Sequence, residues 1–255
     1  MNILDSFKLD GKTAVVTGAG RGLGQGIAIA LAQAGADVLG VGTAENAKET
    51  QAPVEKTGRK FMWKRANLVS CEPVAGIFDE AVKTFGHVDI VVNNAGIIRR
   101  SDAVDFTESD WDDVINLNLK TLFFMCQAAA RQFIKQKSGG KIINIASMLS
   151  FQGGIRVPSY TASKGGVRTL TMLMANEWAK YNINANAIAP GYMATDNTRD
   201  LREDKGRSEA ILGRIPAGRW GTPEDIAGAA VFLASSAADY INGYTLAVDG
   251  GWLAR

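Results

Sequence analysis

The chain has 255 residues, of which 46% are hydrophobic and 21% are charged. This composition is ordinary for a globular protein that can build a substantial core. The formal net charge is only +2, which argues against a nucleic-acid partner. No apolar run is long enough to span a membrane, and residues 1–12 show no signal-peptide pattern. We therefore expect a cytoplasmic protein without a membrane partner.

The histidine and cysteine content restricts the chemistry. His87 is the single histidine and follows a helical stretch, and Cys71 and Cys126 form neither a CxxC pair nor a metal-ligand spacing. One histidine cannot build a multi-histidine metal site, and no G-x-S-x-G elbow accompanies it. We expect no metal ion and no serine-hydrolase triad.

Short β-branched runs alternate along the chain with longer segments of helical spacing. Strands are predicted at 13–17, 37–41, 61–66, 88–92, 141–146, 183–189 and 244–248, and helices at 22–34, 45–57, 72–85, 109–136, 160–181 and 222–235. This alternation is typical of βαβ units around a parallel sheet.

We therefore predict one doubly wound α/β domain of the Rossmann type over residues 1–255. Its seven-stranded sheet is expected to be mostly parallel, with helices on both faces. The polar segment 191–221 interrupts the alternation. It is predicted to cover the substrate as an excursion above the carboxyl edge of the sheet.

A glycine-rich segment, Thr17–Gly24, follows the first strand and opens the first helix. Glycines permit a tight turn and let a pyrophosphate approach the free N–H groups of the helix N-terminus. This pattern predicts a dinucleotide site that includes Gly18, Gly22, Leu23 and Gly24.

The choice of dinucleotide stays open at this stage. The second predicted strand ends in Gly40-Val-Gly-Thr43, without the acid that normally binds the adenosine 2′-hydroxyl, and Glu45 comes two residues later. Arg21 in the glycine loop either meets a 2′-phosphate or simply faces solvent. The residues alone favour neither NAD nor NADP.

Tyr160 and Lys164 are four residues apart at the start of a predicted helix, so they share one face. An ammonium beside a phenol favours the phenolate, which predicts that Lys164 lowers the Tyr160 pKa toward neutrality. A base of that kind suits alcohol oxidation and, in reverse, carbonyl reduction. Ser147 follows the fifth strand at the same sheet edge, where its hydroxyl can bind the substrate oxygen.

In this order, the motifs resemble the short-chain dehydrogenase/reductase family along the whole chain. The resemblance rests on Thr17–Gly24, Asn93–Gly96, Asn118, Ser147, Tyr160, Lys164, Pro190-Gly191 and Thr195. It implies a catalytic set of Ser147, Tyr160 and Lys164. It further implies that Asn118 extends this set by holding a proton-relay water, and that Lys164 binds the nicotinamide ribose.

The same resemblance implies the remaining dinucleotide contacts. Asn94, Ala95 and Gly96 would line the adenosine side, and Asn67-Leu68 stands where the family usually has Asp-Leu or Asp-Val. The contacts expected around the nicotinamide are Tyr160, Lys164, Pro190, Gly191, Met193 and Thr195.

Residues 144–164 and 248–255 are further similar to sugar-acid dehydrogenases of this family. This similarity implies a deoxy-sugar acid of uronate and pectin catabolism as substrate, and NAD as the favoured cofactor with NADP possible. A carboxylate substrate needs a nearby cation. The expected substrate contacts are Ser147, Arg99, Arg156 and Gln152, with Arg100 and Met148 close by. Ion pairs of the arginines with acids such as Asp102 or Asp105 are the alternative.

Other functions remain open on this fold. Gluconate 5-dehydrogenase and 3-ketoacyl carrier-protein reductase belong to the same family, and a non-catalytic dinucleotide sensor would belong to another class. A sensor needs none of Ser147, Tyr160 and Lys164. The predicted helices 109–136 and 161–181 are apolar on more than one face, and the resemblance implies a homotetramer that uses such helices.

Overall fold

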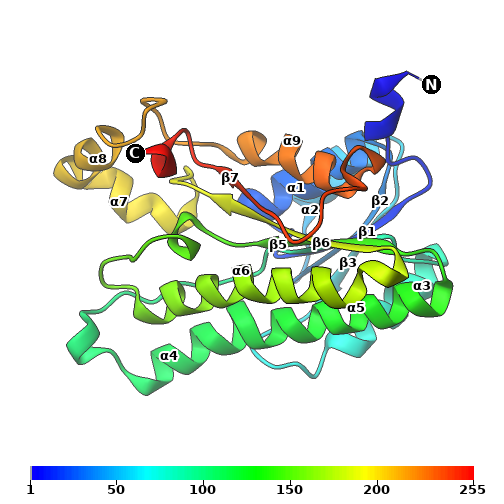
Figure 1. Ribbon diagram of the computed structural model, residues 1–255, viewed down its shortest axis with the longest axis horizontal. Coiled ribbons are helices and arrows are strands. Elements are labelled where there is room, and N and C mark those ends of the chain that lie inside the picture. Colours follow the sequence, from blue (N-terminus) through cyan, green and yellow to red (C-terminus); the bar gives the residue numbers. More distant parts are fainter. Residues whose placement is uncertain (1) are drawn as a thin grey trace.

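A computed structural model describes residues 2–255 of the chain. They form a seven-stranded, wholly parallel sheet with the strand order β3-β2-β1-β4-β5-β6-β7 (Figure 1). The strands are β1 (Thr13–Thr17), β2 (Asp37–Gly42), β3 (Phe61–Arg65), β4 (Ile90–Asn93), β5 (Gly140–Ile145), β6 (Ile183–Pro190) and β7 (Thr245–Val248). The predicted Rossmann-type α/β fold is confirmed.

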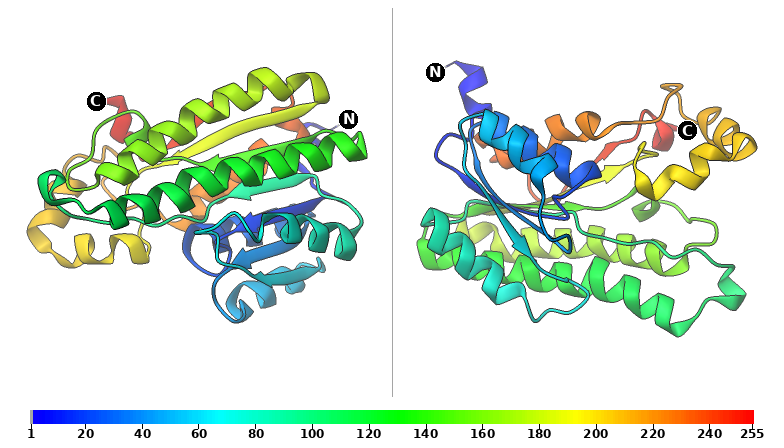
Figure 2. Two further views of the ribbon diagram at one scale, coloured as in Figure 1. Left: turned by 90° about the horizontal axis from the view of Figure 1, so that it is seen from below. Right: turned by 180° about the vertical axis from the view of Figure 1, so that it is seen from behind.

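Helices cover both faces of the sheet, as Figures 1 and 2 show. One face carries α1 (Gly22–Gln33), α2 (Lys48–Lys56) and α9 (Pro223–Ala234), and the other carries α3 (Val74–Phe85), α4 (Glu108–Ile115), α5 (Leu122–Gln136) and α6 (Pro158–Trp178). The central strands are buried on both faces, since every residue of β1 and β4 is buried. This double burial explains why these strands are almost continuous apolar runs.

The helix predicted over 109–136 is not continuous. It is divided into α4 and α5 by a π-helical segment, Asn116–Thr121. Asn118 lies in this segment, and its side-chain amide is hydrogen-bonded to the backbone of Ile97 in both directions, at 2.9 Å each. Hydrophobic spacing predicts the path of the helix but not this wider turn.

Residues 191–221 contain two short helices, α7 (Arg199–Glu203) and α8 (Lys205–Leu212), beyond the end of β6. They pack on a small apolar cluster that is separate from the two faces of the sheet. In this cluster the Trp252 ring makes edge contacts with Tyr192 at a centroid distance of 4.9 Å. Arg255 donates to the backbone carbonyls of Gly213 and Arg214 at the end of α8. The carboxyl-terminal residues therefore fasten this segment.

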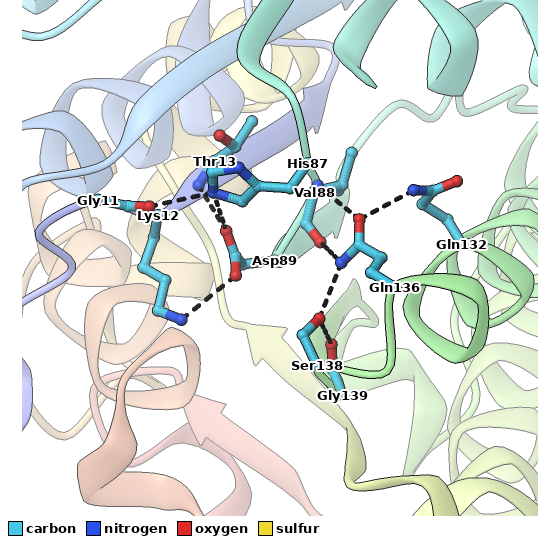
Figure 3. Close-up of polar contacts among 10 residues, drawn as sticks. All are labelled: Gly11, Lys12, Thr13, His87, Val88, Asp89, Gln132, Gln136, Ser138 and Gly139. Carbon is cyan, nitrogen blue, oxygen red and sulfur yellow. Dashed lines mark hydrogen bonds and ion pairs between the residues drawn. The ribbon is translucent and has the colours of Figure 1, made fainter.

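The opposite, amino edge of the sheet carries a polar network around Asp89 (Figure 3). The Asp89 carboxylate accepts from the Thr13 backbone N–H at 2.9 Å and contacts Lys12 at 3.2 Å and His87 at 3.0 Å. Gln136 of α5 bonds both the N–H and the carbonyl of Val88. The single histidine thus lies at a structural junction. Within residues 2–255 no helix is long and apolar enough to cross a membrane.

Candidate active site

The glycine loop after β1 is shaped to receive an anion. Gly18 and Gly22 have φ angles of +66° and +57°, a conformation that favours glycine. Arg21 precedes α1 but provides no side-chain cap, so the first N–H groups of this helix stay available to a ligand. Free N–H groups and the helix dipole are what a pyrophosphate needs. The loop therefore fits a dinucleotide.

Gly24 has a different role from the other predicted contacts. It does not line the cleft, and a Cβ on it would lie 2.2 Å from the Gly18 carbonyl oxygen and 2.4 Å from the Asn94 amide nitrogen. Asn94 donates to the carbonyl of Thr17 at 3.0 Å. Gly24 thus allows α1 to pack directly under the loop, and its contact with a dinucleotide stays a prediction.

A cleft of about 610 Å³ opens at the carboxyl edge of the sheet, above the glycine loop. The predicted dinucleotide contacts that line it are Gly18, Arg21, Gly22, Leu23, Asn67, Leu68, Asn94, Ala95, Gly96, Tyr160, Lys164, Pro190, Gly191, Met193 and Thr195. Lining residues that sequence reasoning missed include Ala44, just after β2, and Trp63, in the middle of β3. Trp63 carries no motif signal, because only the pairing of β3 with β2 brings it to the cleft.

Ser147, Tyr160 and Lys164 meet in the same cleft. Tyr160 lies in the first turn of α6, which starts with Pro158, and the Lys164 ammonium nitrogen is 5.6 Å from the Tyr160 ring centroid. The ammonium donates to the Ile145 carbonyl at 2.5 Å. The Ser147 hydroxyl accepts from the Leu149 backbone N–H at 3.1 Å, which fixes its orientation at the end of β5.

Burial dominates the titration of this pair. It lowers the pKa of Lys164 to about 8. It also raises the pKa of the Tyr160 phenol above its ordinary value, and hydrogen bonding to Ser147 and the charge of Arg100 oppose this increase only in part. The prediction that Lys164 lowers the Tyr160 pKa toward neutrality is therefore wrong, because the protein surroundings together raise it. The helical spacing predicts proximity, but it does not predict the desolvation of both groups.

Asn118 lies beside the cleft but does not line it. Its side chain is fully buried, and besides the two bonds to Ile97 its amide donates to the Ser163 hydroxyl at 3.4 Å. A Cβ at Gly96 would lie 3.1 Å from the Asn118 side-chain oxygen. In this structure Asn118 holds the segment after β4 against the π-helical turn.

The arginines considered for the substrate differ in whether an acidic side chain already pairs with them. Arg99 pairs with Asp110 at 3.2 Å and with Asp113 at 3.1 Å, and Arg156 pairs with Asp102 at 3.0 Å. None of Arg99, Arg100, Gln152 and Arg156 lines the cleft itself. Arg100 instead donates to the backbone carbonyl of Asn197 at 2.9 Å, and Asn197 is a lining residue.

Arg21 is held across the mouth of the cleft. Its guanidinium pairs with Asp196 at 2.9 Å, so it links the glycine loop to the segment after β6. The Arg21 side chain is still 79% exposed, so a role at a 2′-phosphate and a solvent-facing position both stay predictions.

Comparison with known proteins places the chain in a family. A family model described as enoyl-(acyl carrier protein) reductase matches residues 18–253. The 2-dehydro-3-deoxy-D-gluconate 5-dehydrogenases of Escherichia coli (strain K12) and Dickeya dadantii (strain 3937) are 65% and 64% identical to it over 253 residues, covering 99% of this chain and 100% of each relative.

A solved structure is also similar along the whole length. It is described as a candidate 2-deoxy-d-gluconate 3-dehydrogenase from Agrobacterium tumefaciens with bound NADP, is 54% identical, and covers 98% of this chain and 99% of its own, with a TM-score of 0.90. Together these matches confirm the resemblance, and the chain belongs to the short-chain dehydrogenase/reductase family.

Proposed function

We propose that this protein is a nicotinamide-dependent oxidoreductase that acts on 2-dehydro-3-deoxy-D-gluconate at its C5 hydroxyl, or on the corresponding ketone in reverse. The observation that carries the chemistry is the meeting of Ser147, Tyr160 and Lys164 in a cleft that also contains the uncapped start of α1. The 65% identity to a relative of that name supports the substrate.

The side chains supply the proton transfer. When bound, the dinucleotide supplies the hydride acceptor, or the donor in the reducing direction. Tyr160 takes the hydroxyl proton of the alcohol as the carbon loses hydride, and returns it in carbonyl reduction. Ser147 orients the substrate oxygen beside the phenol. As the family resemblance implies, the buried ammonium of Lys164 binds the nicotinamide ribose.

Arg100 is the cation that we propose for the substrate carboxylate. Arg99 and Arg156 were the predicted partners, but acidic side chains already pair with both. Arg100 bonds only a backbone carbonyl at the cleft, and its charge reaches the Tyr160 phenol. A guanidinium in that position can accept a carboxylate without breaking an ion pair. Gln152 and the relay water at Asn118 stay predictions.

The segment 191–221 is proposed to cover the substrate. Met193, Thr195 and Asn197 from its first part line the cleft, and the hydrogen bond from Arg100 to Asn197 joins it to the loop after β4. Substrate bound to Arg100 would therefore contact this segment directly. The proposal fits one domain over the whole chain, with α7 and α8 as its cover.

The testing experiment is a steady-state assay of reduced nicotinamide absorbance with 2-dehydro-3-deoxy-D-gluconate and its 5-keto form, each with NAD(H) and NADP(H). We expect turnover that is lost in Tyr160→Phe. Turnover only with gluconate, or only with 3-ketoacyl thioesters, would replace the substrate and keep the dehydrogenase. Dinucleotide binding with no turnover on any of these would indicate the sensor.

We also propose a homotetramer, with a second copy covering the outer face of α5 and α6. A groove of about 460 Å³ runs between these helices, lined by apolar side chains that include Phe123, Leu170 and Trp178. Phe124, Met172 and Leu173 on the same helices are exposed. Arg131 and Glu177 at the groove offer opposite charges to a symmetric copy. Sedimentation of the wild type and of Leu173→Glu tests this assembly.

The cytoplasmic location stays a prediction.

A further inference from the structure

The adenosine end of the cleft is formed by the tips of two neighbouring strands. β2 and β3 run parallel, with Gly40 opposite Trp63 and Gly42 opposite Arg65. In a doubly wound sheet the adenosine ribose lies beside the tip of the second strand. Gly42, Thr43 and Ala44 line the cleft there, and none of them has a carboxylate. Asp196 is the acid among the described lining residues, and it pairs with Arg21 and Arg199.

Trp63 keeps this end free of a carboxylate. Its indole N–H donates to the Ala44 carbonyl at 3.1 Å, which fixes the ring over the tip of β2. A Cβ at Gly42 would lie 2.7 Å from the end of the indole ring. No side chain therefore fits at position 42 while the ring stays in place. An acid that would accept a hydrogen bond from a ribose 2′-hydroxyl is excluded from this point.

Arg65 brings a positive charge to the same point. Its guanidinium donates through Nε to the Thr43 carbonyl at 3.2 Å, and the side chain is exposed. It forms no ion pair with any residue from 2 to 255, whereas the adjacent Lys64 pairs with Glu80 of α3 at 3.6 Å. Successive residues of a strand point to opposite faces. Arg65 therefore points to the same face as Trp63 and lies beside the cleft without lining it, while Lys64 points to the other face.

We infer that the chain binds the 2′-phosphorylated dinucleotide in preference to NAD, and that Arg65 is the residue that sets this preference. The inference rests on the proposed dinucleotide site but not on the substrate. A guanidinium with free Nη groups suits a phosphate dianion. Arg21, which the sequence offered for this task, is engaged with Asp196. The specificity thus comes from the third strand rather than from the glycine loop.

The test is calorimetric titration of NADP and of NAD into the full-length protein without substrate. We expect NADP to bind at least about 10-fold more tightly, the size of one charge-assisted contact. Arg65→Gln should weaken NADP binding about 10-fold and leave NAD binding within about twofold. Arg65→Lys should retain part of the preference. Lys64→Gln is the matched control, and it should change neither affinity.

The outcomes separate this inference from the proposed function. An equal loss of NAD and NADP affinity in Arg65→Gln would overturn the inference, because it would indicate a structural role at the tip of β2. Unchanged affinity for both, or tighter binding of NAD by the wild type, would overturn it as well. Failure to turn over the sugar acid leaves these titrations unaffected. The steady-state ratio of kcat/KM for the two cofactors should follow the binding ratio.

Discussion

The two edges of the sheet are both rich in polar groups, but they differ in how these groups are satisfied. At the amino edge, Asp89 contacts Lys12, Thr13 and His87 (Figure 3). Gln136 there accepts a hydrogen bond from the Val88 N–H and donates one to the Val88 carbonyl. At the carboxyl edge, the first N–H groups of α1 have no side-chain cap. The Lys164 ammonium has one hydrogen bond, to the Ile145 carbonyl, among the described residues.

The difference shows where a ligand can bind. Groups at the amino edge already have protein partners, so a ligand there would have to break existing bonds. At the carboxyl edge, the N–H groups of α1 and the Lys164 ammonium keep hydrogen-bond donors without a protein partner among the described residues, and a ligand can bind to them. A cluster of titratable residues therefore marks a functional site only when the protein leaves its hydrogen-bonding capacity open. The comparison predicts large kinetic effects at one edge and purely structural effects at the other.

The largest effect is expected from Tyr160→Phe. Removing the hydroxyl removes the proton donor and acceptor, so kcat should fall about 10³-fold, within the range of general acid–base catalysis. The ring remains to pack, and the free energy of unfolding should stay within about 0.5 kcal/mol of the wild type. Steady-state kinetics and dinucleotide titration check both points. Unchanged turnover would show that another group at the carboxyl edge moves the proton.

The next effect concerns the loss of stability caused by burying the charged Lys164 ammonium. The pKa is about 8 in the folded chain, against 10.5 for an ordinary lysine. Below about pH 8 the folded protein must hold a buried ammonium. As pH rises from there toward 10.5, the folded state loses the proton first and the wild type gains stability.

Lys164→Met should therefore be inactive but more stable than the wild type at neutral pH. The advantage should shrink by about 2 kcal/mol between about pH 7 and pH 9.5, because burial no longer penalises the neutral amine. Urea unfolding of both proteins across this range measures the difference. A gap that does not change with pH would show that burial of the charge is not what separates them.

A smaller kinetic effect is expected from Arg100→Ala. Losing a charged contact to the substrate carboxylate should raise KM for the sugar acid about 10-fold, with a smaller change in kcat. Arg156→Ala is the matched control, because the Arg156 guanidinium, on the loop after β5, is already paired with Asp102. An equal increase in KM for both variants would indicate a general effect on the loop rather than a carboxylate contact.

How far the sequence predicts this molecule depends on whether a feature is periodic or tertiary. The predicted bounds of β1 agree with the structure, because residues 13–17 form a short β-branched run, and all five of them are buried. The spacing of Tyr160 and Lys164 placed them on one helical face, and they do meet in the cleft. These features are local, so they can be inferred from neighbours in the chain.

The features that could not be predicted depend on distant partners. The π-helical turn at Asn118 is held by Ile97, 21 residues away in sequence. Which arginine stays free of acids depends on how the loops after β4 and β5 fold together. The position of Trp63 over Gly42 depends on strand register. Sequence motifs identify the reacting groups, but the walls of the site are set by tertiary contacts.

The smallest effect is expected at the amino edge of the sheet. Asp89→Asn keeps the shape of the side chain and one acceptor oxygen, but it removes the charge that faces Lys12 and His87. We expect a loss of about 1 kcal/mol in the free energy of unfolding, because one charge-assisted contact is weakened at a partly exposed site. The kcat/KM value should stay unchanged, since Asp89 directly precedes β4 and the cleft lies beyond the carboxyl end of that strand. A marked fall in kcat/KM without loss of stability would instead mean that the two edges are coupled through β4, and that the amino edge is more than a structural junction.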